Sequence, residues 1–187
     1  MRYQIAAFAD EADAAISGQI EAMRAEHISL LEIRGVDGKS VADLTVPEAK
    51  ALRARLADEG IAVWSVGSPY GKSEVTEAFG LRLDEFRHGL ELAEALGASH
   101  IRLFSFYLPR GEAPETFRDE VLDRLSRFCE AAKGSGIVLC HENEKGIYGD
   151  VAPRCAEIHR ALPELKAVFD PANFIQSGQA TLPAWEL

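Results

Sequence analysis

The chain has 187 residues, of which 47% are hydrophobic and 27% are charged, and its formal net charge is −10. This composition is ordinary for one globular domain with a sizeable core, and it argues against disordered or fibrous proteins. Because a net negative charge repels the phosphates of DNA and RNA, we expect no nucleic-acid partner.

Short apolar segments alternate along the chain with longer amphipathic ones. Strands are expected, in chain order, at Gln4–Phe8, Ser29–Arg34, Ile61–Val66, His100–Phe104, Ile137–Cys140 and Lys166–Phe169, several of them apolar on both faces. Helices are expected at Ala12–Glu26, Pro47–Glu59, Glu74–Leu96, Pro114–Lys133 and Val151–Leu162. Alternating strands and helices predict an α/β fold with a parallel sheet covered by helices.

Proline and glycine positions agree with these boundaries. Pro47 and Pro114 stand where the first turn of a helix tolerates proline. Gly60, Gly97 and Gly136 each lie between a helix and the next strand, where a left-handed residue ends a helix. Their regular spacing predicts a repeated βα unit.

Two architectures fit a parallel sheet of this kind, a doubly wound open sheet and a TIM barrel. The first strand is followed by AAFADEADAA, without the GxGxxG of dinucleotide-binding folds. Polar residues gather just after many of the strands, as they do at the active-site face of a barrel. We therefore predict a (β/α)8 TIM barrel with about six of its eight units in residues 1–187, as a single incomplete domain that lacks its C-terminal part.

Three cysteines, Cys129, Cys140 and Cys155, include no CxxC pair and predict reduced thiols rather than a disulfide framework. No apolar run approaches the roughly 20 residues of a membrane span. The apolar stretch near the N-terminus is too short for a secretory signal. We expect a cytoplasmic protein without a membrane partner, and a homo-oligomer stays open.

Two strand ends carry the strongest candidates for chemistry. In GIVLCHENEKGIYGD, alternation sends Glu142 and Glu144 to one side of the strand and His141 and Asn143 to the other. In LKAVFDPANF, Asp170 ends the next strand, and an Asx turn is the alternative role for it. Two carboxylates on neighbouring strand ends favour a shared divalent-cation site or a general base, with a solvated charged loop as the alternative.

A third segment, VGSPYGKS, is one residue short of a phosphate-binding P-loop. Its Lys72 is a candidate for an anionic group of a substrate, and a plain Gly/Pro turn is the alternative.

Together these segments resemble the sugar phosphate isomerase/epimerase family of xylose isomerase-like TIM barrels. The resemblance rests on EIRGVDGKSV, VGSPYGK, HIRLFSFY, HENEKGIYGD and FDPANFIQSG, and it runs along essentially the whole chain. It implies a divalent cation (Mn, Mg, Co or Zn) held by a Glu, an Asp, a His and a second Glu. Glu142 and Asp170 match the first two ligands, and the other two are expected beyond Leu187. Many relatives have a His where this chain has Asn173.

The resemblance further implies an enzyme that isomerises or epimerises a small sugar, sugar phosphate or polyol derivative. The cation would polarise the carbonyl and stabilise an ene-diolate, and Glu142 would be both ligand and proton carrier. Further candidates for substrate contacts are Arg34, Lys72, His141, Lys145 and Asn173. The alternatives are a dehydratase or lyase on the same scaffold, a metal-dependent DNA-repair endonuclease, which the charge argues against, and an inactive 187-residue fragment.

Overall fold

The computed structural model describes residues 3–187. A six-stranded sheet has the order β1-β2-β5-β6-β7-β8, which keeps the order of these strands along the chain. Within this sheet β1 pairs with β2, β2 with β5 and β7 with β8, each in parallel orientation. The strands are β1 (Ala6–Ala7), β2 (Leu30–Ile33), β5 (Ala62–Gly67), β6 (His100–Leu103), β7 (Val138–Glu142) and β8 (Lys166–Val168). All six predicted strands are thus confirmed, although the first is only two residues long.

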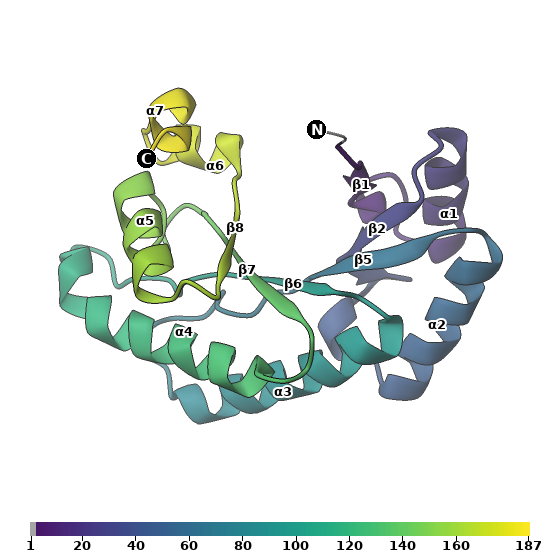
Figure 1. Ribbon diagram of the computed structural model, residues 1–187, viewed down its shortest axis with the longest axis horizontal. Coiled ribbons are helices and arrows are strands. Elements are labelled where there is room, and N and C mark those ends of the chain that lie inside the picture. Colours follow the sequence, from purple (N-terminus) through teal and green to yellow (C-terminus); the bar gives the residue numbers. More distant parts are fainter. Residues whose placement is uncertain (1–2) are drawn as a thin grey trace. The chain divides into compact units, whose positions relative to one another are not determined.

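Five long helices alternate with these strands, as the amphipathic segments predict (Figure 1). They are α1 (Ile16–Ala25), α2 (Val46–Asp58), α3 (Phe79–Leu96), α4 (Arg118–Ala132) and α5 (Ala152–Ala161). Gly60, Gly97 and Gly136 have φ of 73°, 73° and 78°, which confirms the left-handed conformation expected for them.

The chain forms two compact units. One contains the described residues up to Ser68 together with His88–Ile101, and the other contains Pro69–Arg87 and Arg102–Leu187. The first unit therefore holds β1, β2 and β5, and the second holds β7 and β8. The sequence-based assignment of a single domain over 1–187 stays a prediction.

The first unit is organised around the parallel pair β2–β5. Leu31 and Val63 are partners in this register, and both side chains are buried. Helix α2 packs on β5. It begins with a capping box in which Thr45 and Glu48 satisfy each other's backbone amides. A buried apolar sheet face and a capped amphipathic helix together account for the local fold.

An aromatic cluster forms the core of the second unit. The Phe128 ring lies 4.4 Å from Phe86, 5.1 Å from Phe79 and 6.0 Å from Phe106, between centroids. Phe128 lies on the face of α4 that also carries Val121 and Leu125, and all three side chains are buried. Contacts of this kind add to the hydrophobic stabilisation of a core.

Some boundaries differ from the sequence-based prediction. Strand β7 continues through Glu142, so His141 and Glu142 are strand residues rather than loop residues. Helix α3 begins at Phe79 instead of Glu74, because the amide of Val75 donates to the carbonyl of Tyr107 at 2.9 Å. Backbone pairing with Tyr107 thus holds this segment extended.

Several short elements were not predicted. An antiparallel hairpin joins β3 (Gly35–Val36) and β4 (Lys39–Ser40), and its turn residues Asp37 and Gly38 both have positive φ. The Asp-Gly pair is a known hairpin signal. The other elements are α6 (Pro171–Gln176), α7 (Thr181–Trp185) and the 3-10 turns η1 (Ala9–Glu11) and η2 (Val41–Asp43). The helix predicted from Pro114 begins as the 3-10 turn η3 (Pro114–Phe117) and continues directly into α4.

Within residues 3–187 no helix has the length and apolar character needed to cross a bilayer.

The structure predicts a large effect of a methyl group at Gly71. This residue has φ of 83°, and a Cβ here would lie 2.0 Å from the carbonyl oxygen of Phe104. We expect Gly71→Ala to lower the free energy of unfolding by about 2–4 kcal/mol, from the left-handed backbone and the overpacking together. Urea denaturation would measure this loss.

Gly111→Ala is the matched control, because Gly111 has φ of 85° and no atom lies within 4 Å of its Cβ position. We expect this variant to lose only the backbone part, about 1–2 kcal/mol. Equal losses in the two variants would contradict the steric explanation.

Candidate functional site

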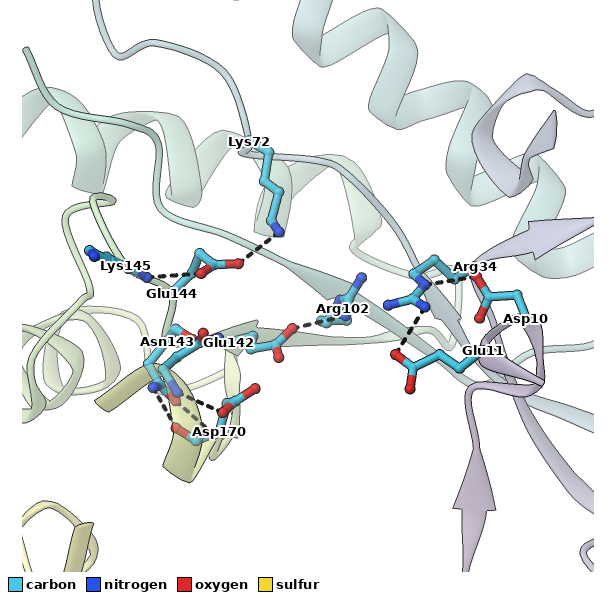
Figure 2. Close-up of polar contacts among 11 residues, drawn as sticks. Asp10, Glu11, Arg34, Lys72, Arg102, Glu142, Asn143, Glu144, Lys145 and Asp170 are labelled. Atoms are coloured by element: carbon cyan, nitrogen blue, oxygen red, sulfur yellow. Dashed lines mark hydrogen bonds and ion pairs between the residues drawn. The ribbon is translucent and has the colours of Figure 1, made fainter. Parts of the chain in front are cut away.

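The two carboxylates predicted as metal ligands come from neighbouring strands of the second unit. Glu142 is the last residue of β7 and is the register partner of Val168, the last residue of β8. Asp170 follows two residues later and caps α6, with its Oδ1 accepting from the amide of Asn173 at 2.8 Å. Because parallel strands end at the same edge of a sheet, Glu142 and Asp170 share that edge (Figure 2).

The side chain of Asn143 joins the ends of these two strands. Its Nδ2 donates to the carbonyl oxygen of Asp170 at 2.8 Å, and its Oδ1 accepts from the amide of Asp170 at 2.8 Å. In addition, Nδ2 of Asn173 donates to the carbonyl oxygen of Asn143 at 3.0 Å. The Asn143 amide therefore extends the β7–β8 ladder by side-chain hydrogen bonds and holds the backbone of Asp170.

Glu142 forms an ion pair that was not predicted. Nη1 of Arg102, on β6, lies 3.0 Å from Oε2 of Glu142, and each side chain is only 10% exposed. The sequence contained a signal for Arg102, a cation inside the otherwise apolar strand segment HIRLF. Such a charge is rarely buried without a partner. Arg102 thus joins Glu142 in the site.

Lys72 and Glu144 form a second ion pair of this unit. Nζ of Lys72 lies 2.8 Å from Oε2 of Glu144 and 4.3 Å from the centroid of the Phe104 ring. The loop that carries Lys72 is tied to the segment after β6, because Phe104 donates to the carbonyl of Tyr70 and Phe106 to that of Gly71. These backbone bonds place Lys72 beside the Phe104 ring.

Phe106 is buried with φ of 63°, a left-handed conformation unusual for a bulky residue. Strict strand alternation after Phe104 would place Phe106 on the same side as Phe104. Instead, its ring joins Phe79 and Phe128 in the aromatic core. The backbone reversal directs the ring into the aromatic core of this unit, and left-handed strain of this kind clusters near functional sites.

His141 points away from the edge that carries Glu142. Its Nε2 lies 2.9 Å from Oγ of Ser105, which also accepts from the amide of Gly149, and its ring lies 5.8 Å from that of His159. Burial, together with the neighbouring His159, lowers the pKa of His141 to about 3. A cavity of about 560 Å³ adjoins this ring, lined mainly by apolar residues of β8, α5, α6 and α7. His141 is therefore a neutral, buried packing residue, as strand alternation requires.

The remaining candidates are placed as follows. Lys145 is exposed, and its backbone amide donates to the Glu144 side chain. Arg34 belongs to the first unit, where its guanidinium contacts Asp10 at 2.8 Å and Glu11 at 3.1 Å. Hydrogen bonding to Asp10 raises the pKa of Arg34 further. The second unit therefore contains every predicted site residue except Arg34, but His141 lies on the opposite face of β7 from Glu142.

The oxygen atoms of this site suit a hard cation only in part. Glu142 and Asp170 supply carboxylates, the ligand type that Mg²⁺, Mn²⁺ and Zn²⁺ accept. Residues 3–187 contain no group of three or more His, Cys, Asp or Glu side chains arranged to hold a metal ion. The two carboxylates are the ligand type that such a cation takes, but they are fewer than the six or more oxygen ligands typical of a hard cation.

A parallel sheet with helices between its strands and polar residues gathered at the strand ends is typical of α/β barrel proteins. The family model for the Xylose isomerase-like TIM barrel matches residues 26–187, and the chain belongs to this family. The family resemblance and the TIM-barrel fold predicted from the sequence are confirmed.

Solved structures with the same fold include enzymes of several activities. The probable 3-DHS dehydratase AsbF of Bacillus anthracis is 16% identical with a TM-score of 0.78, over 100% of this chain and 69% of that one. The IOLI protein with a bound zinc atom is 14% identical with a TM-score of 0.76, over 96% and 66%. An L-ribulose 3-epimerase is 19% identical with a TM-score of 0.68, over 94% and 62%.

At these identities the likeness concerns the fold, and the chain spans about two thirds of the length of each of these proteins. No curated protein sequence matches the chain.

The Asn143 amide pair predicts a specific loss on mutation. Asn143→Asp keeps an acceptor for the Asp170 amide but places a carboxylate oxygen against the Asp170 carbonyl. We expect a loss of about 2–4 kcal/mol in the free energy of unfolding, from one broken bond and the unpaired buried groups. The chain has no exposed asparagine that could serve as a matched control. The comparison is therefore Asn143→Ser, which removes the amide group and its reach to Asp170 without adding a charge.

Thermal and urea unfolding would measure both variants. The explanation fails if Asn143→Asp is as stable as the unsubstituted protein.

The buried His141 predicts a pH dependence of stability. The unfolded chain takes up this proton near the ordinary pKa of 6.5, whereas the folded protein does so only near 3. Between these values the unfolded state binds more protons, so stability is present above pH 6.5 and is lost as the pH falls. The slope from this group is at most about 1.4 kcal/mol per pH unit.

We expect His141→Gln to flatten the dependence of unfolding free energy on pH between 5 and 6.5. His159→Gln is the comparison variant, because burial lowers the pKa of His159 as well. An unchanged slope in His141→Gln would show that this histidine does not carry the effect.

Proposed function

We propose that this protein is a metal-dependent isomerase or epimerase of a small carbohydrate derivative, with Glu142 and Asp170 as metal ligands. The observation that carries the proposal is the placement of both carboxylates on adjoining ends of β7 and β8, in a chain of the xylose isomerase-like family. The fold of an L-ribulose 3-epimerase is among those that this chain shares. The proposed metal is Mn, Mg, Co or Zn. Zinc is the ion bound in the IOLI structure.

In the proposed reaction the side chains of this unit have distinct roles. A divalent cation, when bound, polarises the carbonyl and hydroxyl oxygens of a sugar. Glu142 moves the proton next to the carbonyl, and Arg102 orients its carboxylate from 3.0 Å. Asn143 holds the backbone of Asp170, so that the second carboxylate is positioned by the sheet.

The substrate contacts belong to residues near this edge. Lys72 and Lys145 are our candidates, because Lys72 adjoins the Phe104 ring and Lys145 follows Glu144 on an exposed segment. Asn173 is already engaged with Asn143 through its amide, which favours a supporting role. We give His141 no substrate contact, because its ring is on the other face of β7. Arg34 stays a candidate in the first unit.

A dehydratase is the second candidate function. The observation in its favour is the shared fold with the probable 3-DHS dehydratase AsbF over the whole of this chain. Dehydration also begins by removing a proton beside a carbonyl, so Glu142 would keep its role. Mass spectrometry of the product separates the two reactions, because loss of water changes the mass and isomerisation does not.

We also propose that the protein works in the cytoplasm on a small-molecule carbohydrate, without a nucleic-acid or membrane partner. Cys129, Cys140 and Cys155 are thiols rather than members of disulfides, which suits a reducing compartment.

Replacement of Glu142 tests the proposal directly. In the intact protein, as distinct from the 187-residue chain alone, we expect turnover on a panel of ketoses, sugar phosphates and sugar acids to require a divalent metal. Glu142→Gln should lower kcat at least about 100-fold, because the proton carrier and a ligand are lost together. Glu130→Gln, an exposed carboxylate change on α4, should leave kcat within about twofold. Metal-independent turnover, or full activity in Glu142→Gln, would refute the assignment.

The 187-residue chain alone should be inactive, because two carboxylates are fewer ligands than a hard cation takes. We expect Mn²⁺ titration to show weak binding, lowered at least about tenfold further in Asp170→Asn. Robust metal-dependent turnover by this chain would contradict the expectation.

A further inference from the structure

Two cationic side chains lie against the ring of Phe104, and each of them pairs with a carboxylate. Nζ of Lys72 lies 4.3 Å from the ring centroid, and the guanidinium carbon of Arg102 lies 4.9 Å from it. Glu142 pairs with Arg102, and Glu144 pairs with Lys72 (Figure 2). One aromatic ring thus carries two cations, each held by a carboxylate of β7 or of the loop that follows it.

Stability alone is a weak reason for a cation at position 102. The side chains of Arg102 and Glu142 are both 10% exposed, so the pair has lost most of its hydration. Buried ion pairs are often no more stable than well-packed apolar residues of the same volume. A guanidinium at this depth, beside a candidate catalytic carboxylate, is better explained by a ligand that it recognises.

We propose that Arg102 and Lys72 form a binding subsite for an anionic group of the substrate, a carboxylate or a phosphate. The inference rests on the proposed function, which assigns Glu142 to the reacting end of the substrate. It narrows the substrate class to acidic sugar derivatives, that is, sugar acids or sugar phosphates, and it disfavours neutral sugars as substrates.

The chemistry of the two side chains supports this class. The planar fork of arginine matches the two oxygens of a carboxylate or phosphate, and lysine adds a compact second charge. The side chains of Lys72 and Glu144 are 34% and 21% exposed, so an anion can reach the Lys72–Glu144 pair from solvent. Glu142 competes with the anion for Arg102, and the competition weakens when the charge of Glu142 is neutralised.

Anion binding to the metal-free protein tests the subsite without reference to turnover. The probes are inorganic phosphate and glycerate, with glycerol as the neutral comparison, and the measurements are thermal unfolding and isothermal titration. We expect Glu142→Gln to bind at least one anion more tightly than the unsubstituted protein, because the competing charge is gone. Adding Arg102→Gln to Glu142→Gln should weaken this binding at least about tenfold. Lys72→Gln should weaken it less, since Lys72 is more exposed.

Lys133→Gln, an exposed lysine on the C-terminal side of α4, is the control for a change in net charge and should leave anion binding unchanged. If Arg102→Gln does not fold, Arg102→Lys keeps the charge but removes the fork, and should still weaken binding. Preference for glycerate indicates a sugar acid, and preference for phosphate indicates a sugar phosphate. Equal binding by Glu142→Gln and its Arg102→Gln derivative, or no anion binding by any variant, would overturn the proposal.

The two proposals can fail separately. Loss of anion binding in the Arg102 variants would support the subsite even if no isomerase or dehydratase activity were found. Conversely, metal-dependent turnover of a neutral sugar with no anion binding would leave the proposed function intact and reject the subsite.

Discussion

The parallel pairing of β7 with β8 is the constraint on which the candidate site depends. Its register sets Glu142 opposite Val168, and the Asn143 side chain continues the ladder to the backbone of Asp170. A side-chain amide that bonds both the N–H and the C=O of a neighbouring strand acts as one more ladder residue. The carboxylates of Glu142 and Asp170 consequently lie at the same edge of the sheet, although they need not contact each other.

Strand alternation places the candidate catalytic residue and a buried histidine of β7 on opposite faces of the sheet. Glu142 reaches the edge with Arg102, whereas the preceding His141 turns to Ser105 and His159 on the opposite face. Burial in that layer keeps the imidazole neutral. Gly149 is needed beside this ring, because a Cβ there would lie 2.5 Å from its Cε1. Because successive side chains of a strand point to opposite faces, two consecutive residues of β7 contribute to a charged face and to a close-packed face.

The charges of the site are matched in pairs rather than left isolated. Arg102 and Lys72 each meet a carboxylate and the Phe104 ring. In a partly desolvated setting such pairing reduces the cost of burying ions. The pairing also couples the members of each pair, because removing the charge of one carboxylate allows its partner cation to attract another anion.

The amino-acid sequence by itself determined the alternation of strands and helices, the left-handed glycines and the family. Local periodicity, turn chemistry and strand-end motifs carry this information within a few neighbouring residues. It also indicated Glu142 and Asp170, since carboxylates directly after apolar strands are local features.

Only the tertiary structure decided which polar residues meet. Arg102 became part of the site through its ion pair with a strand forty residues away, and Asn143 and Asn173 became supports of Asp170. The extended segment before α3 likewise follows from pairing with Tyr107. Contacts between distant segments depend on register and on the packing of whole elements, which no local pattern in the chain encodes.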